Sequence, residues 1–139
     1  MAAFNKFQDF VEQLGLKKHD LNADVLKIYL SNAVPSASLD AVKADLAEIG
    51  AGFGYTAGGE DTLNTYTESG GTGSCVGTDV TWTATGGAIG PFQYVVLYND
   101  TQTVPADPLI GWWDYGSPLT LNAGESFTTD FGASMFTIA

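Results

Sequence analysis

From Gly50 onward, short apolar stretches alternate with turn-forming residues, and this pattern constrains the fold more than any other feature. Pairs such as Gly70-Gly71 and Gly86-Gly87 separate the stretches and favour tight turns. Many short strands at this spacing predict a mainly β fold, a jelly-roll-like sandwich or barrel. Without a convincing repeat or linker, we expect one β-rich domain over residues 1–139. The predicted strands are 62–68, 73–77, 79–84, 92–98, 108–115, 118–121, 125–131 and 134–138.

Helices are predicted only before this region. Apolar residues at steps of three and four predict an amphipathic N-terminal helix over about residues 3–15, ending near Gly15. A run rich in Val, Ile and Tyr predicts a strand at 25–31. One further short helix is predicted within 38–50, where Leu39, Val42, Leu46 and Ile49 share a face.

Two stretches, FQYVVLYND (92–100) and LIGWWDYG (109–116), are apolar almost throughout. Strands of this kind are usually buried on both faces. Strict alternation places Leu109, Trp113 and Tyr115 on one side of the second strand and Ile110, Trp112 and Asp114 on the other. At least one tryptophan therefore faces the core, while the other is covered by a second layer, by the helices or by another chain.

The charges divide the chain in two. All five basic residues are lysines within residues 1–43, and only five of the sixteen acidic residues lie there. The formal charge of −11 therefore falls after Lys43. Nucleic acids and anionic membranes both attract basic surfaces, so we expect neither as a partner.

The residues that could carry chemistry are few. His19 is the only histidine and is predicted to be a solvated or locally hydrogen-bonded loop residue, while Cys75 is predicted to be a buried or half-buried, inert thiol. Asp114 with Glu125 or Glu68 could form a glycosidase-like pair, but no spacing selects these acids. Asp100 and Asp107 lack the spacing of a calcium loop. We expect no enzyme activity, no cofactor and no metal.

Four segments resemble, in order and nearly end to end, a family of small structural proteins of tailed bacteriophages. The similarity extends to the capsid cement, or decoration, proteins of short-tailed phages such as those that infect Bordetella. The segments are HDLNADVLKIYLSN (19–32), ADLAEIGAGFGYTAGG (44–59), GPFQYVVLYND (90–100) and PLIGWWDYGSPLTLNAGESF (108–127).

The resemblance implies a jelly-roll-like virion protein that binds the outer capsid surface and clamps adjacent major capsid protein subunits, and no catalytic or ligand residue is carried over from it. Its expected partners are the major capsid protein and other copies of itself, as a dimer or trimer. Because residues 1–15 lack the pattern of a secretion signal and no stretch is long and apolar enough to span a membrane, we expect synthesis in the host cytoplasm.

The charge division adds a hypothesis about contacts: the lysine-bearing segment from Phe4 to Lys18, with one apolar sheet edge or face, binds the capsid. The alternative function is that of a glycan-binding adhesin, or tail or head-fibre component, in which paired tryptophans stack on sugars. A non-decorating scaffold or tail-completion protein is the third possibility. The candidate contact residues are Phe4, Lys6, Phe7, Lys17, Lys18, Trp112 and Trp113.

Overall fold

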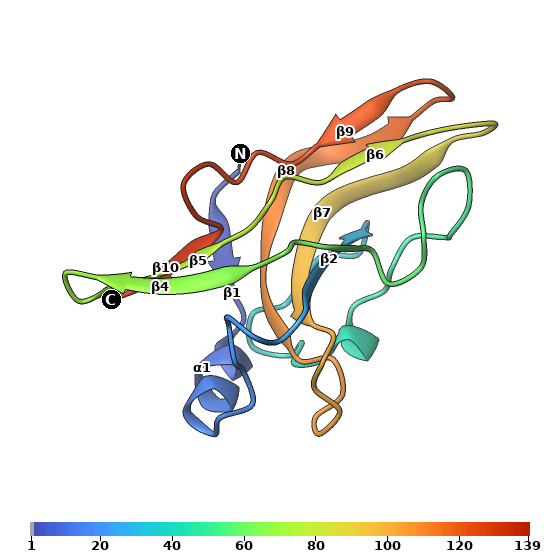
Figure 1. Ribbon diagram of the computed structural model, residues 1–139. Helices are drawn as coiled ribbons and strands as arrows, with labels where there is room; N and C mark the ends of the chain where they lie inside the picture. Colours follow the sequence, from blue (N-terminus) through green and yellow to red (C-terminus); the bar gives the residue numbers. More distant parts are fainter. Residues whose placement is uncertain (1) are drawn as a thin grey trace.

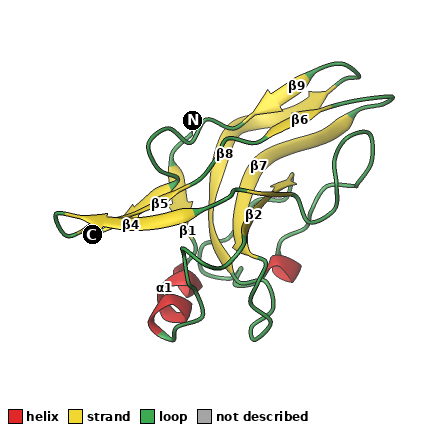
Figure 2. Ribbon diagram, viewed as in Figure 1, coloured by secondary structure: helices red, strands yellow, loops and turns green. Residues whose placement is uncertain are grey.

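Three antiparallel sheets form the protein in a computed structural model that describes residues 2–139 (Figures 1 and 2). No sheet in these residues closes into a barrel, and the mainly β prediction is confirmed. The five-stranded sheet has the order β1 (Phe4–Lys6), β8 (Leu109–Leu121), β7 (Ile89–Asn99), β2 (Leu26–Ser31) and β3 (Glu60–Asp61). The other sheets are β10 (Phe136–Ile138), β5 (Thr72–Val76) and β4 (Thr65–Ser69), and the pair β6 (Thr81–Thr83) and β9 (Ser126–Thr128).

Strand β7 lies at the centre and is covered on both sides, as its continuous apolar sequence predicts. Val95 and Leu97 belong to the larger core cluster, which also contains residues of the two smaller sheets. Val96 and Tyr98 belong to a second cluster on the opposite face. Exposure of these four side chains does not exceed 1%.

Strand β8 does not keep the strict alternation expected of it. Trp113 shares the larger core cluster with Ile110, whereas Trp112 packs against the second cluster with Leu109. The predicted grouping of Leu109 with Trp113 is therefore wrong. The cause is a register shift beside Gly111: Leu97 pairs with Gly111, but Tyr98 pairs with Leu109. One extra residue on β8 reverses which face each following side chain takes.

The N-terminal segment is helical only in its second part, so the predicted helix over about 3–15 is partly wrong. Helix α1 spans Gln8–Gly15, and the preceding residues form β1 against β8. The Phe4 ring stacks on Phe136 at 4.9 Å and meets Trp113 edge-on at 5.4 Å. It lies where a side chain at Gly111 would be, so that glycine makes room for β1. Aromatic packing thus outweighs the helical periodicity.

The helix predicted within 38–50 is wrong apart from one 3-10 turn, η1 (Lys43–Asp45). Acidic side chains close local turns instead: Asp40 accepts a hydrogen bond from the Ser36 amide at 2.8 Å, and Asp45 accepts one from the Ala41 amide at 2.9 Å. Such side-chain bonds compete with helix formation. Leu46 is buried, but Leu39, assigned to the same helical face, is 81% exposed.

Candidate contact surface

His19 is a buried structural residue, and the prediction of a solvated or locally bonded loop histidine is wrong. The side chain is 8% exposed, and its Nδ1 lies 3.1 Å from the Asn99 amide nitrogen, far away in sequence. Asn99 also donates to Asp24 at 2.8 Å. Burial lowers the pKa of His19 to about 4, although Asp24 and Asp9 act to raise it. His19 is therefore neutral at physiological pH.

Cys75 and Asp114 occupy settings of opposite kinds. Cys75 is fully buried, as predicted, and burial raises the pKa of its thiol to about 12. Asp114 is exposed, and hydrogen bonds from the Gln93 side chain at 2.9 Å and the Gly116 amide at 2.7 Å lower its pKa.

In residues 2–139 no cluster of three or more His, Cys, Asp or Glu side chains could hold a metal ion. Over the same residues, no helix is long and apolar enough to cross a membrane.

The structure separates the seven predicted contact residues into buried and accessible ones. Phe7 and Trp113 are 0% and 2% exposed, so in this fold neither offers surface to a partner. Trp112 is half-buried, its ring 4.6 Å from that of Phe7. The other four retain accessible surface: Phe4, Lys6, Lys17 and Lys18.

Most exposed apolar side chains gather at one end of the molecule, which we call the α1 end. It lies at the bottom of Figure 1, where α1, the loop after β2 and the turn between β7 and β8 meet. Five of the nine exposed large apolar side chains in residues 2–139 belong to these segments, adjoin α1 or precede β2. They are Val11, Leu16, Val25, Leu39 and Val104, between 36% and 81% exposed.

Backbone hydrogen bonds hold the segments of the α1 end together. The Gln8 amide donates to the Ala37 carbonyl at 2.9 Å, which ties α1 to the loop after β2. The Leu109 amide donates to the Ala41 carbonyl at 2.9 Å, which ties that loop to β8. The exposed side chains are therefore presented by a fixed framework, and an apolar surface of this kind is typical of a protein interaction site.

Three lysines at or beside the α1 end form no ion pair within residues 2–139. Lys27 pairs with Asp100 at 3.1 Å and Lys43 with Glu48 at 3.2 Å. No other lysine in residues 2–139 lies within ion-pair distance of an acidic side chain, so Lys6, Lys17 and Lys18 are available to a partner. Acidic side chains also occur here, because Asp9 and Glu12 belong to α1.

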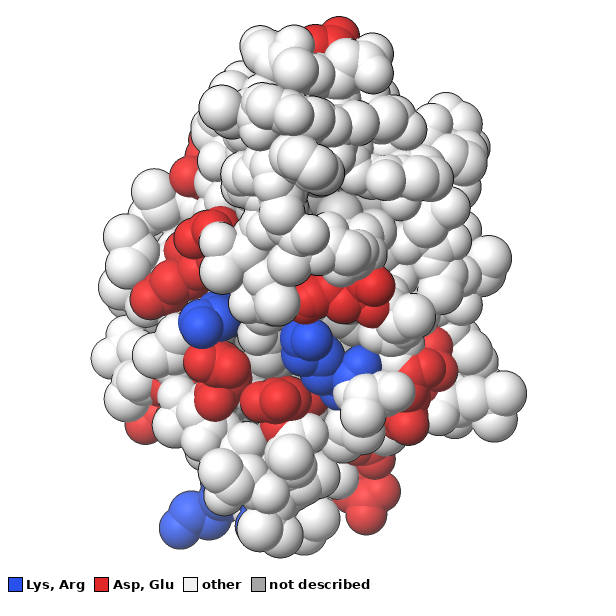
Figure 3. Space-filling view, turned by 90° about the vertical axis from the view of Figure 1, so that its right-hand side faces the viewer, with Lys and Arg blue, Asp and Glu red and all other residues white. Residues whose placement is uncertain are grey.

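The opposite end, which we call the β6–β9 end, has a different surface. Hydroxyl groups face one another across the two strands: Thr81 meets Thr128 and Thr83 meets Ser126, both at 2.8 Å. In Figure 3 charged side chains gather over the lower half of the visible face, and the upper half, at the height of β6 and β9 in Figure 1, is almost uncharged.

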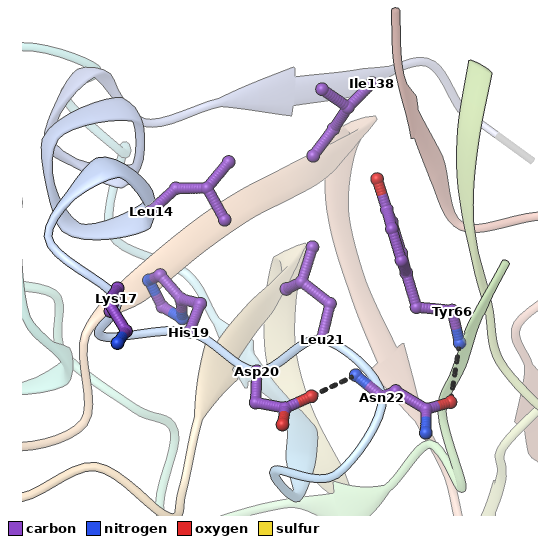
Figure 4. A pocket seen from close by; sticks show the side chains of 8 residues that line it. All are labelled: Leu14, Lys17, His19, Asp20, Leu21, Asn22, Tyr66 and Ile138. Carbon is purple, nitrogen blue, oxygen red and sulfur yellow. Dashed lines mark hydrogen bonds between the residues drawn. The ribbon is translucent and has the colours of Figure 1, made fainter. Parts of the chain in front are cut away.

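A trough runs beside α1 and consists of two adjoining hollows that share Leu14 and Ile138. The larger, about 530 Å³, has side chains from α1, residues 17–22, β4 and β10 around it (Figure 4). Leu21 and Tyr66 line it, and the Tyr66 amide donates to Asn22 at 3.1 Å. The smaller, about 300 Å³, lies between β1, α1 and β10.

Sequence reasoning missed much of this surface. Leu39 was predicted to lie on a helical face, and Val104 lies in a loop where no periodicity marks it. Ile138 belongs to a predicted strand, but only the fold brings it beside α1. Comparison with known proteins adds no assignment: no family model, curated protein or solved structure matches the chain.

Proposed function

We propose that this chain is a capsid decoration protein of a tailed phage, with a jelly-roll-like fold, which binds the outer surface of the head and joins adjacent major capsid protein subunits without catalysing a reaction. The sequence resemblance suggests the class of protein. The observation that carries the proposal is the α1 end, where exposed apolar side chains and unpaired lysines occur together on a chain of net charge −11.

The physical case rests on repetition. The capsid offers the same binding surface many times, so each copy of a decoration protein needs only modest contact energy. A copy that contacts two neighbouring capsid subunits binds more tightly, because its first contact holds it close to the second site. Exposed apolar side chains such as Leu39 and Val104 would supply that energy when the capsid covers them, at about 1.5–3 kcal/mol for each one fully covered. The acidic remainder of the protein would face solvent, and its negative charge would make decorated particles repel one another.

The glycan-binding alternative has less support from the fold. A sugar platform needs aromatic faces open to the ligand, but Trp113 is 2% exposed and Trp112 packs against Phe7. The two neighbouring tryptophans therefore do not form a paired platform.

Counting copies on the particle tests the proposal. The full-length protein is mixed with purified, undecorated heads, unbound protein is removed, and the bound copies are counted by quantitative mass spectrometry. Hundreds of copies per head are expected of a decoration protein. A dozen or fewer would indicate a tail component, and no binding would refute the proposal.

Deleting residues 1–18 is a poor test of capsid binding, because the deletion removes Phe7 and Phe10, which are core residues at 0% and 2% exposure.

A further inference from the structure

The outer edge of β10 forms one wall of the smaller hollow of the trough. Four consecutive residues, 136–139, line that hollow. Side chains of a strand alternate between its two faces, so consecutive residues can line one space only if the backbone edge itself borders it. The hollow therefore presents main-chain groups as well as side chains.

This edge has no partner in the described chain. Strand β10 pairs with β5 on one side, with Phe136 opposite Cys75 and Ile138 opposite Gly73. On its other side no strand or side chain within residues 2–139 is hydrogen-bonded to it. An unpaired strand edge is a template for the backbone of another chain.

The rest of the trough suits the side chains of an extended segment. Phe4, Phe10, Val11 and Leu14 provide apolar walls beside the edge, and Lys6 provides the only basic group of the smaller hollow. The larger hollow continues past Leu14 and Ile138, with Lys17 at its border. The two hollows adjoin each other and are mostly apolar, and a lysine borders each of them.

We propose that an extended segment of the capsid subunit lies in this trough and adds a strand to the free edge of β10. Its main chain pairs with residues 136–138, its alternate apolar side chains enter the two hollows, and an acidic residue meets Lys6. Strand addition of this type combines main-chain hydrogen bonds for affinity with pockets for specificity. The inference rests on the proposed function, since it names the part of the capsid subunit that the decoration protein recognises.

Site-specific photocrosslinking tests the pairing. Thr137 is exposed on β10 and is replaced by the photoreactive residue p-benzoylphenylalanine, and the labelled protein is bound to undecorated heads and irradiated. The same label at Thr85, exposed near the β6–β9 end, is the matched control. We expect a crosslink to one extended peptide of the major capsid protein from position 137 and none from position 85. A crosslink from position 137 to a second copy, or none on heads that carry the labelled protein, would overturn the inference.

Substitutions in the trough give a second readout. Ile138→Asp places a charge between the two hollows, and we expect at least tenfold weaker binding to heads. Because Ile138 also packs against the core, the exposed Lys6→Glu serves as a second variant, with an expected three- to fivefold loss. Leu63→Asp, at a residue that is 66% exposed and outside the trough, is the control and should bind normally. Unchanged binding by both trough variants would contradict strand addition but leave the decoration function standing, whereas failure of the wild-type protein to bind heads would refute both.

Discussion

The two ends of the molecule place their apolar residues in opposite ways. At the β6–β9 end Trp82 is 1% exposed and lies against Phe127 and Tyr55, while threonine and serine hydroxyls cover the surface. At the α1 end Leu39 and Val104 are 81% and 71% exposed on loops. The β6–β9 end buries most of its large apolar side chains, although Phe53 stays 55% exposed, whereas the α1 end retains several exposed apolar side chains for a partner.

Stability should respond to this difference most strongly. Trp82→Ala should lower the free energy of unfolding by about 3–5 kcal/mol, because it leaves a large cavity beneath β6 and β9. Leu39→Ala should change it by less than about 0.5 kcal/mol, since the side chain is already in water. Urea denaturation of both variants measures the two effects. Similar losses would mean that the two ends are packed alike.

Acid should loosen the α1 end first. The folded state holds the pKa of His19 near 4, mainly through burial, against about 6.5 when unfolded, so the unfolded chain binds more protons between these values. Stability is therefore complete above about pH 6.5 and falls as the pH drops toward 4, by about 3 kcal/mol in all.

Two measurements check this loss. Urea denaturation across the pH range should show the slope in the wild type and not in His19→Leu, and a slope that persists in the variant would assign it to other groups. Hydrogen exchange should show α1 amides losing protection at a higher pH than those of β6 and β9.

Of the two ends of the molecule, only the α1 end should contribute to binding to heads. The double variant Leu39→Asp, Val104→Asp places two charges in the contact and should bind about a hundredfold more weakly, equivalent to about 2.7 kcal/mol. Phe53 is 55% exposed, and its carbonyl accepts a hydrogen bond from Thr85 near the β6–β9 end, so Phe53→Asp is the matched control. Equal losses of head binding in the two variants would mean that the two ends do not differ as capsid contacts.

The lysines should contribute a smaller, salt-dependent part. Lys17→Glu should weaken binding about tenfold in 50 mM salt and less than threefold in 500 mM, because added ions screen exposed charges. Thr85→Glu adds negative charge away from the α1 end and should leave binding unchanged. A loss that does not vary with salt would indicate that Lys17 acts through packing rather than charge.

The centre of the fold was predictable because its residues satisfy strand pattern and burial together. Val95 and Val96 show this, since a strand apolar at every position has to be covered on both faces. The prediction of a helix over 38–50 was wrong because the spacing of apolar residues does not show that the Asp40 and Asp45 side chains can accept hydrogen bonds from nearby backbone amides. The assignment of β8 side chains to the two faces was wrong because a single extra residue beside Gly111 cannot be detected in the pattern of apolar residues.

The contact surface was only partly predictable. The distribution of charge along the sequence predicted a contact in the N-terminal segment, and Lys17 of that segment does lie at the α1 end, free of ion pairs. Phe7 was proposed for contact because it belongs to an apolar stripe, but a stripe cannot distinguish a face packed on its own core from one offered to a partner. Val104 comes to the same end only through the length of β7 and β8.

Hydroxyl-radical footprinting, read by mass spectrometry on free and head-bound protein, tests most directly whether the α1 end is the capsid-binding surface. It should show strong protection of Leu16, Leu39 and Val104 on binding, with Phe53 oxidised equally in both states. Protection of Phe53 and continued oxidation of Leu39 and Val104 would place the contact at the opposite end and contradict the assignment.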